Sequence, residues 1–184
     1  MSTPSQEVQP LSLAGIVGDR GGPFFLRRIA RSTPWNDALA TRDITAVTGY
    51  LYEHGQRVSL WQVNSDLDLR RVAIAINESR ESFTERVEFL PILPDELNAV
   101  GVTCEPTTGE TSCPAAAILH YDAEVDETKC SRIITMLINA GRRLARCTKG
   151  QMSVALRDSQ SDGCFAVSDS LSCKCGADRS QLAV

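Results

Sequence analysis

The stretch Gln56–Asn77, QRVSLWQVNSDLDLRRVAIAIN, combines two hydrophobic periods and decides how the chain is interpreted. Along residues 57–63 the side chains alternate in character, and a period of two places neighbours on opposite faces of a strand. Ser65-Asp66-Leu67-Asp68 has the spacing of a capping box, which satisfies backbone NH groups at the start of a helix. Apolar residues then recur at helical spacing, at Leu69, Val72, Ala73 and Ile76. The stretch predicts a strand, a tight turn and a helix.

A strand is the alternative for residues 69–77. Val72, Ile74 and Ile76 also alternate, and β-branched residues suit a strand. The alanines at 73 and 75 favour a helix, because alanine has the highest helix propensity and adds little to a strand. Together with the capping box in front of them, they make the helix the better prediction.

The remaining patterns predict an α/β or α+β fold, with a mixed sheet of four to six strands packed by three main helices in one domain. The expected strands cover residues 24–31, 57–63, 87–93, 115–121 and 152–157. The expected helices cover residues 34–54, with an interruption near Thr41 allowed, 66–79 and 127–149. Residues 102–104 and 113–121 flank a turn-forming segment and predict a hairpin.

The helix at 127–149 is predicted from its ends. Asp126 suits the N-cap, arginines and Lys149 suit the C-terminal end of the helix dipole, and Gly150 ends it. After Gly150, alternating apolar residues predict the strand at 152–157. The expected domain runs over residues 11–170, between a flexible lead at 1–10 and a disordered tail at 171–184.

Length and composition indicate an ordinary globular protein. The chain has 184 residues, of which 42% are hydrophobic and 23% charged, which fits one folded domain. A net charge of −4 argues against a nucleic-acid partner, although three adjacent arginine pairs leave a phosphate-binding face as an alternative. No apolar run reaches 18 residues and the N-terminus lacks the pattern of a secretory signal, so we expect a cytoplasmic protein without membrane contact.

Seven cysteines are the least routine feature of the chain. No Cys-x-x-Cys pair is present, so the common zinc-binding spacing is missing. Cys164, Cys173 and Cys175 are the best candidates for a thiolate metal or redox site, which is the alternative to a protein without a cofactor. An odd number of cysteines and the missing signal favour free thiols.

One catalytic arrangement can be drawn from the sequence. His120 and Asp122 follow an apolar segment, and with Cys104 or Cys113 they would form a nucleophilic triad. A half-buried histidine at the end of a strand is the simpler interpretation, so we expect no catalytic residues.

The leading hypothesis for function is a non-catalytic protein-binding or adaptor domain, because no self-sufficient catalytic or cofactor motif is present. Its partner would be another protein or a second copy of the chain. Exposed aromatic and arginine side chains often anchor such contacts. The candidate contact residues are Tyr50, Tyr52, Trp61, Arg70 and Arg71.

Overall fold

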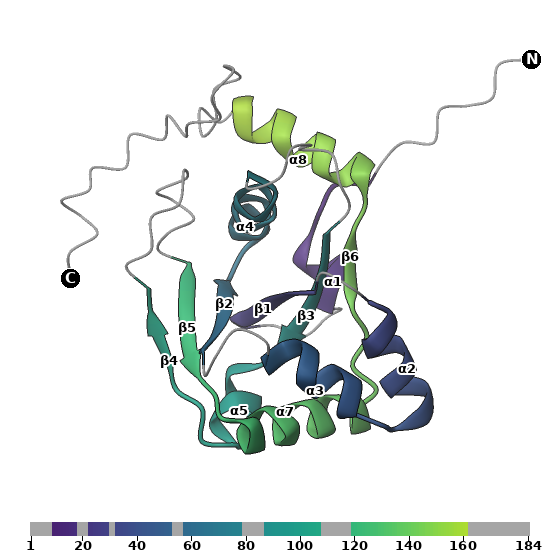
Figure 1. Cartoon of the computed structure of the whole chain (residues 1–184). Coiled ribbons are helices and arrows are strands. Elements are labelled where there is room, and N and C mark those ends of the chain that lie inside the picture. Colours follow the sequence, from purple (N-terminus) through teal and green to yellow (C-terminus); the bar gives the residue numbers. More distant parts are fainter. Residues whose placement is uncertain are drawn as a thin grey trace, which may run out of the picture.

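A six-stranded sheet lies at the centre of the protein, with helices on both of its faces (Figure 1). The computed structural model describes residues 9–17, 22–29, 32–52, 57–78, 87–107 and 119–161. The strands are β1 (Phe24–Ile29), β2 (Arg57–Val63), β3 (Val87–Ile92), β4 (Cys104–Pro106), β5 (His120–Glu124) and β6 (Ala145–Cys147). The helices are α1 (Leu13–Val17), α2 (Thr33–Thr41), α3 (Thr45–Tyr52), α4 (Asp66–Glu78), α5 (Pro94–Asn98), α7 (Glu127–Asn139) and α8 (Lys149–Ser161).

The order of strands in the sheet is β4-β5-β2-β1-β3-β6. The structure confirms the predicted α/β class and the upper limit of six strands. Every described strand pair is antiparallel. The prediction of a mixed sheet, with both parallel and antiparallel pairs, is therefore wrong. β4 and β5 pair antiparallel, as expected for the hairpin, but Glu105 and Pro106 belong to β4 and not to the turn. Residues 108–118 between the two strands lie outside the described part of the chain.

The sheet separates two hydrophobic cores. The lower core lies against α2, α3, α5 and α7, and the upper core lies against α1, α4 and α8 (Figure 1). Neighbouring residues of β1 divide between them, since Phe25 and Ile29 belong to the lower core whereas Phe24 and Leu26 belong to the upper core. This alternation follows from the two-residue period of a strand. We call the two groups of helices the lower layer and the upper layer.

The stretch Gln56–Asn77 folds as predicted, with β2 followed by α4. The Asp68 backbone NH donates to Ser65 Oγ at 3.1 Å, and the Asn64 NH donates to Asp68 Oδ2 at 3.1 Å. These bonds satisfy backbone groups at the helix start. Leu69, Val72 and Ala73 are fully buried against the sheet, which rules out the strand alternative for this segment.

The predicted helix at 34–54 is interrupted where the sequence allowed it. α2 ends at Thr41, and Arg42 adopts a left-handed conformation with φ of 66°. Its guanidinium donates to the Ile138 carbonyl near the end of α7, which ties the turn to the lower layer. α3 then begins at Thr45.

The continuous helix predicted at 127–149 is wrong. α7 ends at Asn139, and Gly141 has φ of 66°. The Gly141 NH donates to Ile138 O at 3.0 Å and the Arg142 NH donates to Leu137 O at 2.9 Å, the bond pattern of a Schellman motif. The chain then reverses and forms β6, which pairs with β3.

The strand predicted at 152–157 is wrong as well, because these residues belong to α8. Thr148 and Gln151 form a reciprocal cap, in which the Gln151 NH donates to Thr148 Oγ1 at 3.2 Å and the Thr148 NH donates to Gln151 Oε1 at 3.0 Å. Met152 and Ala155, three residues apart, are buried on the same side of the helix.

Other predicted boundaries are confirmed only in part. β1 and β3 lie within the expected strands at 24–31 and 87–93. β5 begins at His120, so that histidine opens its strand instead of ending it. Of the expected lead, residues 1–8 lie outside the described residues, and so does the whole tail at 171–184.

Candidate functional site

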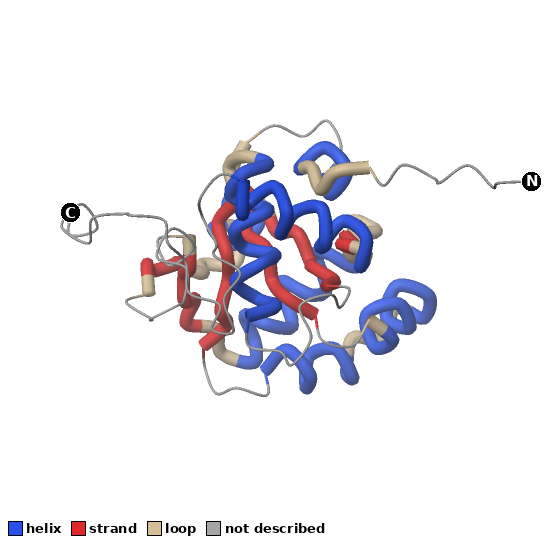
Figure 2. Tube along the Cα trace, turned by 90° about the horizontal axis from the view of Figure 1, so that it is seen from above, coloured by secondary structure: helices blue, strands red, loops and turns tan. Residues whose placement is uncertain are grey.

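The half of the sheet formed by β4, β5 and the first part of β2 extends past the upper layer. Seen from above, β4 and β5 lie to the left of the described helices (Figure 2). Along β5, Ala123 and Tyr121 contact the lower core, so His120, Asp122 and Glu124 point to the opposite side. One face of this half is therefore packed, and the other carries polar side chains.

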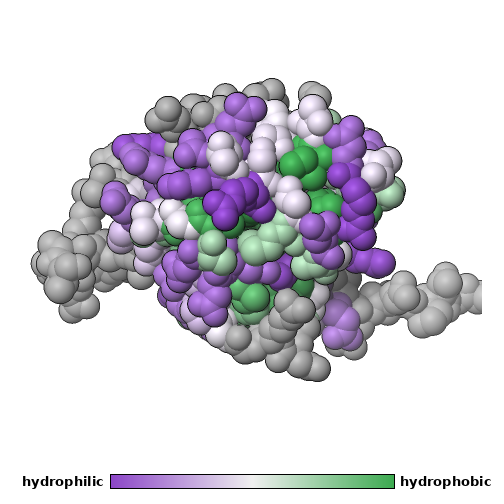
Figure 3. All heavy atoms as spheres, turned by 90° about the horizontal axis from the view of Figure 1, so that it is seen from below, coloured by the Kyte–Doolittle hydropathy of each residue, from purple (hydrophilic) through white to green (hydrophobic). Residues whose placement is uncertain are grey.

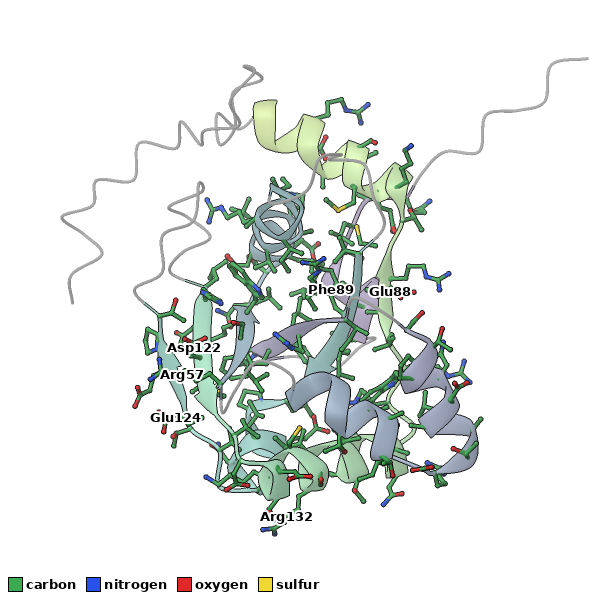
Figure 4. The ribbon with its side chains drawn as sticks, viewed as in Figure 1. Arg57, Glu88, Phe89, Asp122, Glu124 and Arg132 are labelled. Carbon is green, nitrogen blue, oxygen red and sulfur yellow. The ribbon has the colours of Figure 1, made fainter. Side chains whose placement is uncertain are left out.

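A groove with a volume of about 380 Å³ lies on this polar face. It is lined by Arg57, Ser59, Thr103, Glu105, Pro106, Thr107, His120, Asp122 and Glu124. We call it the sheet groove. Figure 4 shows Arg57, Asp122 and Glu124 close together at this edge of the molecule, far from Arg132 on α7.

Strand register fixes which side chains meet in the sheet groove. Arg57 lies opposite Glu124, and Arg57 Nη2 is 3.6 Å from Glu124 Oε1. Ser59 lies opposite Asp122, and its hydroxyl donates to Asp122 Oδ1 at 3.4 Å. On the other side of Asp122, the β4 residue directly opposite is Glu105. Two carboxylates therefore face each other across neighbouring strands.

His120 sits at one end of the sheet groove, on top of Trp61. The two rings are stacked, with centroids 4.4 Å apart and an interplanar angle of 26°. His120 Nδ1 is 2.9 Å from Thr107 Oγ1, so the ring is held from two sides. Trp61 is in turn supported by the upper core.

The environment favours the neutral form of His120. Burial lowers the pKa of the imidazole below its usual 6.5, the negative charge of Asp122 raises it, and the positive charge of Arg27 lowers it again. The net effect is downward because desolvation penalises the charged ring. A neutral ring stacked on tryptophan and bonded to threonine is suited to holding a shape and a contact.

The triad with Cys104 is not formed. Cys104 lies opposite Ala123 in the sheet and packs against the lower core, on the other face from His120. Burial raises the pKa of the Cys104 thiol to about 11, so the nucleophilic thiolate is disfavoured. Cys113, the other nucleophile considered, lies outside the described residues.

The predicted contact residues divide between the two sides of the sheet. Tyr50 and Tyr52 lie on α3 in the lower layer, and their side chains are outside the described part of the structure. Trp61 points to the upper side, where α4 carries Arg70 and Arg71. Arg71 Nη1 is 4.0 Å from Asp68 Oδ1, so this arginine also has a role within its own helix.

The cysteines proposed for a metal, Cys164, Cys173 and Cys175, lie outside the described residues. Within the described ranges, Cys104, Cys130 and Cys147 are free cysteines. The same ranges contain no group of three or more His, Cys, Asp or Glu side chains arranged to hold a metal ion.

The sequence predicts no contact role for several residues of the sheet groove: Arg57, Ser59, Glu105, Thr107 and Glu124. The signal that would have found part of the set is the alternation in residues 120–124, HYDAE, where polar side chains occupy every second position. The predicted strand stopped at Tyr121 and cut this pattern short.

Comparison with known protein families, curated proteins and solved structures finds no match to this chain. Among the described helices, none combines the length and the apolar character needed to cross a membrane.

Proposed function

We propose that the protein is a non-catalytic protein-binding domain and that the sheet groove, with the stacked Trp61 and His120 at its end, is its contact surface. One observation carries the proposal. A hollowed polar face of the central sheet extends past the described helices of the upper layer, although the opposite face of the same strands is packed. The partner is another protein or a second copy of the chain.

The internal contacts of the groove support binding over catalysis. The Asp122 carboxylate accepts from the Ser59 hydroxyl, and His120 is engaged by Thr107. A histidine that acts as a general base needs a nucleophile on one ring nitrogen and an orienting group on the other. Here the Asp122 carboxylate contacts the Ser59 hydroxyl and the His120 ring contacts the Thr107 hydroxyl, so the two groups have separate partners.

The lower side of the molecule provides less support for a contact surface. Seen from below, hydrophobic side chains form small patches separated by hydrophilic ones (Figure 3). Aromatic side chains are enriched at protein contact surfaces, and on the upper side the stacked Trp61 and His120 supply such a group next to the groove. Of the predicted contact residues, Trp61 is retained at the end of the groove, and Arg70 and Arg71 belong to α4 on the same side of the sheet.

Site-specific photocrosslinking tests the proposal. A photoreactive amino acid replaces Glu124, whose side chain is 79% exposed at the edge of the groove. In the matched control, the photoreactive amino acid replaces Arg132, an exposed residue on α7 in the lower layer. We expect irradiation in cells to give a discrete protein adduct from position 124 and none from position 132. Equal adducts at both positions, or none at 124, would refute the proposed surface.

The proposal also places the protein in the cytoplasm. Free thiols at Cys104, Cys130 and Cys147 support it, because oxidising compartments favour disulfides. Cell fractionation checks this location, and recovery in a secreted or membrane fraction would contradict it.

A further inference from the structure

The sheet groove has an unbalanced charge. Glu105, Asp122 and Glu124 contribute three carboxylates, and Arg57 contributes one guanidinium. Arg57 is already next to Glu124, at the outer edge, where both side chains are more than two-thirds exposed. None of the ion pairs between described residues involves Glu105 or Asp122, so the negative charge is concentrated at the centre of the groove.

Strand register places two of these carboxylates side by side. Side chains directly opposite on neighbouring antiparallel strands have Cβ atoms about 4.5–5.5 Å apart, and like charges placed there destabilise the pair. Glu105 and Asp122 occupy such a position. The Ser59 hydroxyl stabilises one of the two carboxylates without neutralising it. A cation supplied from outside would remove the repulsion.

The spacing of the carboxylates matches an extended chain. Asp122 and Glu124 are two residues apart on β5 and point to the same side, which separates them by about 6.6 Å. Alternate side chains of an extended peptide have the same separation. Basic residues at every second position can therefore reach the Glu105–Asp122 pair and Glu124 together.

We infer that the sheet groove binds an extended segment of a partner protein that carries lysine or arginine at alternate positions. The inference rests on the proposed function and names the chemistry of the partner. The net charge of −4 assists the approach of such a segment over longer distances. The same charge repels nucleic acid, and an apolar segment would bury the carboxylates without compensation.

Fluorescence polarisation with a labelled eight-residue peptide, in which lysine alternates with threonine, tests the inference on the full chain. The matched peptides place glutamate at the lysine positions or gather the four lysines at one end. We expect the alternating peptide to bind most tightly and its affinity to fall with increasing salt. Equal affinity for the alternating and the gathered peptide, or no binding of either, would overturn the inference.

Two double variants distinguish binding in the sheet groove from nonspecific attraction by the net charge of the protein. Glu105→Gln with Asp122→Asn removes the central carboxylates, and we expect about a tenfold loss of affinity, equivalent to about 1.4 kcal/mol. Asp37→Asn with Asp95→Asn makes the same change in net charge at exposed positions of α2 and α5 and should alter affinity less than about twofold. Equal losses in both variants would show nonspecific attraction and contradict the inference.

Stability provides a second readout. Because the repulsion between Glu105 and Asp122 is removed, their double variant should unfold at the same or a higher urea concentration than the wild-type chain. A lower midpoint would show that the carboxylates serve the fold, which contradicts the inference.

If the photocrosslink at position 124 forms while no basic peptide binds, the proposed function stands and the inferred chemistry of the partner fails. If the crosslink is also missing, the proposed function fails as well.

Discussion

The two halves of the sheet are formed by strands of different character. β1 and β3 lie between the upper and the lower layer, and all six residues of β3 are buried. β5 belongs to the other half, and of its five residues Ala123 alone is fully buried. A continuous apolar run is typical of a strand covered on both faces, whereas alternation is typical of a strand covered on one. The difference teaches that a strand's own sequence encodes whether its second face is covered.

The largest effect is expected in the covered half. Phe89 on β3 is fully buried in the upper core, and Phe89→Ala should lower the free energy of unfolding by about 3–5 kcal/mol. Urea denaturation followed by far-UV circular dichroism measures the change. Glu124→Ala, in the open half, should stay within about 0.5 kcal/mol and serves as the control. Similar losses in the free energy of unfolding for the two variants would contradict the difference between the covered and the open half.

A smaller effect is expected at the edge of the covered half, where a carboxylate is buried. Glu88 is 7% exposed, and both Nε and Nη2 of Arg146 donate to its Oε1, at 3.0 and 2.8 Å. Arg146→Ala leaves this carboxylate without its partner and should cost about 1–2 kcal/mol, reduced because the arginine is 54% exposed. Adding Glu88→Gln should recover part of the loss in urea denaturation. Fully additive losses would mean that the two side chains are not coupled.

The elements with a single hydrophobic period were the easiest to predict. β1, β2, β3 and α4 follow from local patterns, because each lies within one unbroken hydrophobic period. The predicted helix and strand at residues 139–157 are wrong because two capping signals override the apolar pattern there. Gly141 ends α7, and Thr148 with Gln151 starts α8. Both are short-range signals, so the correct elements could be predicted from the sequence by weighting caps above apolar alternation.

The candidate site could be predicted only in fragments. Trp61 and His120 were each noted, but their stacking depends on the register of β2 against β5, and a one-residue shift would send one ring to the other face. The pairing of Glu105 with Asp122 depends in the same way on the register of β4. Contacts between strands distant in sequence are set by the whole fold, and local patterns do not contain them.

Within the open half, pH should act through His120. Its pKa lies below 6.5 in the folded protein, so the unfolded chain takes up the proton first as pH falls. The stability contributed by the neutral ring is therefore complete above about pH 6.5 and is lost as pH falls below it. NMR titration of the ring should give a midpoint under 6.5, and Asp122→Asn should lower it further because a charge that raises the pKa is removed. A midpoint above 6.5 would contradict the buried environment assigned to the ring.

The smallest effect is expected at the outer edge of the open half. Arg57 and Glu124 are 68% and 79% exposed and 3.6 Å apart, so water and salt screen their attraction. A double-mutant cycle with Arg57→Ala and Glu124→Ala should give a coupling energy below about 0.5 kcal/mol in urea denaturation at physiological ionic strength. A coupling above about 1 kcal/mol would mean that this pair is part of the folded framework. If the coupling energy is below about 0.5 kcal/mol, Glu124 can leave Arg57 and pair with a cation of a partner at little cost in free energy. A contact surface needs this behaviour.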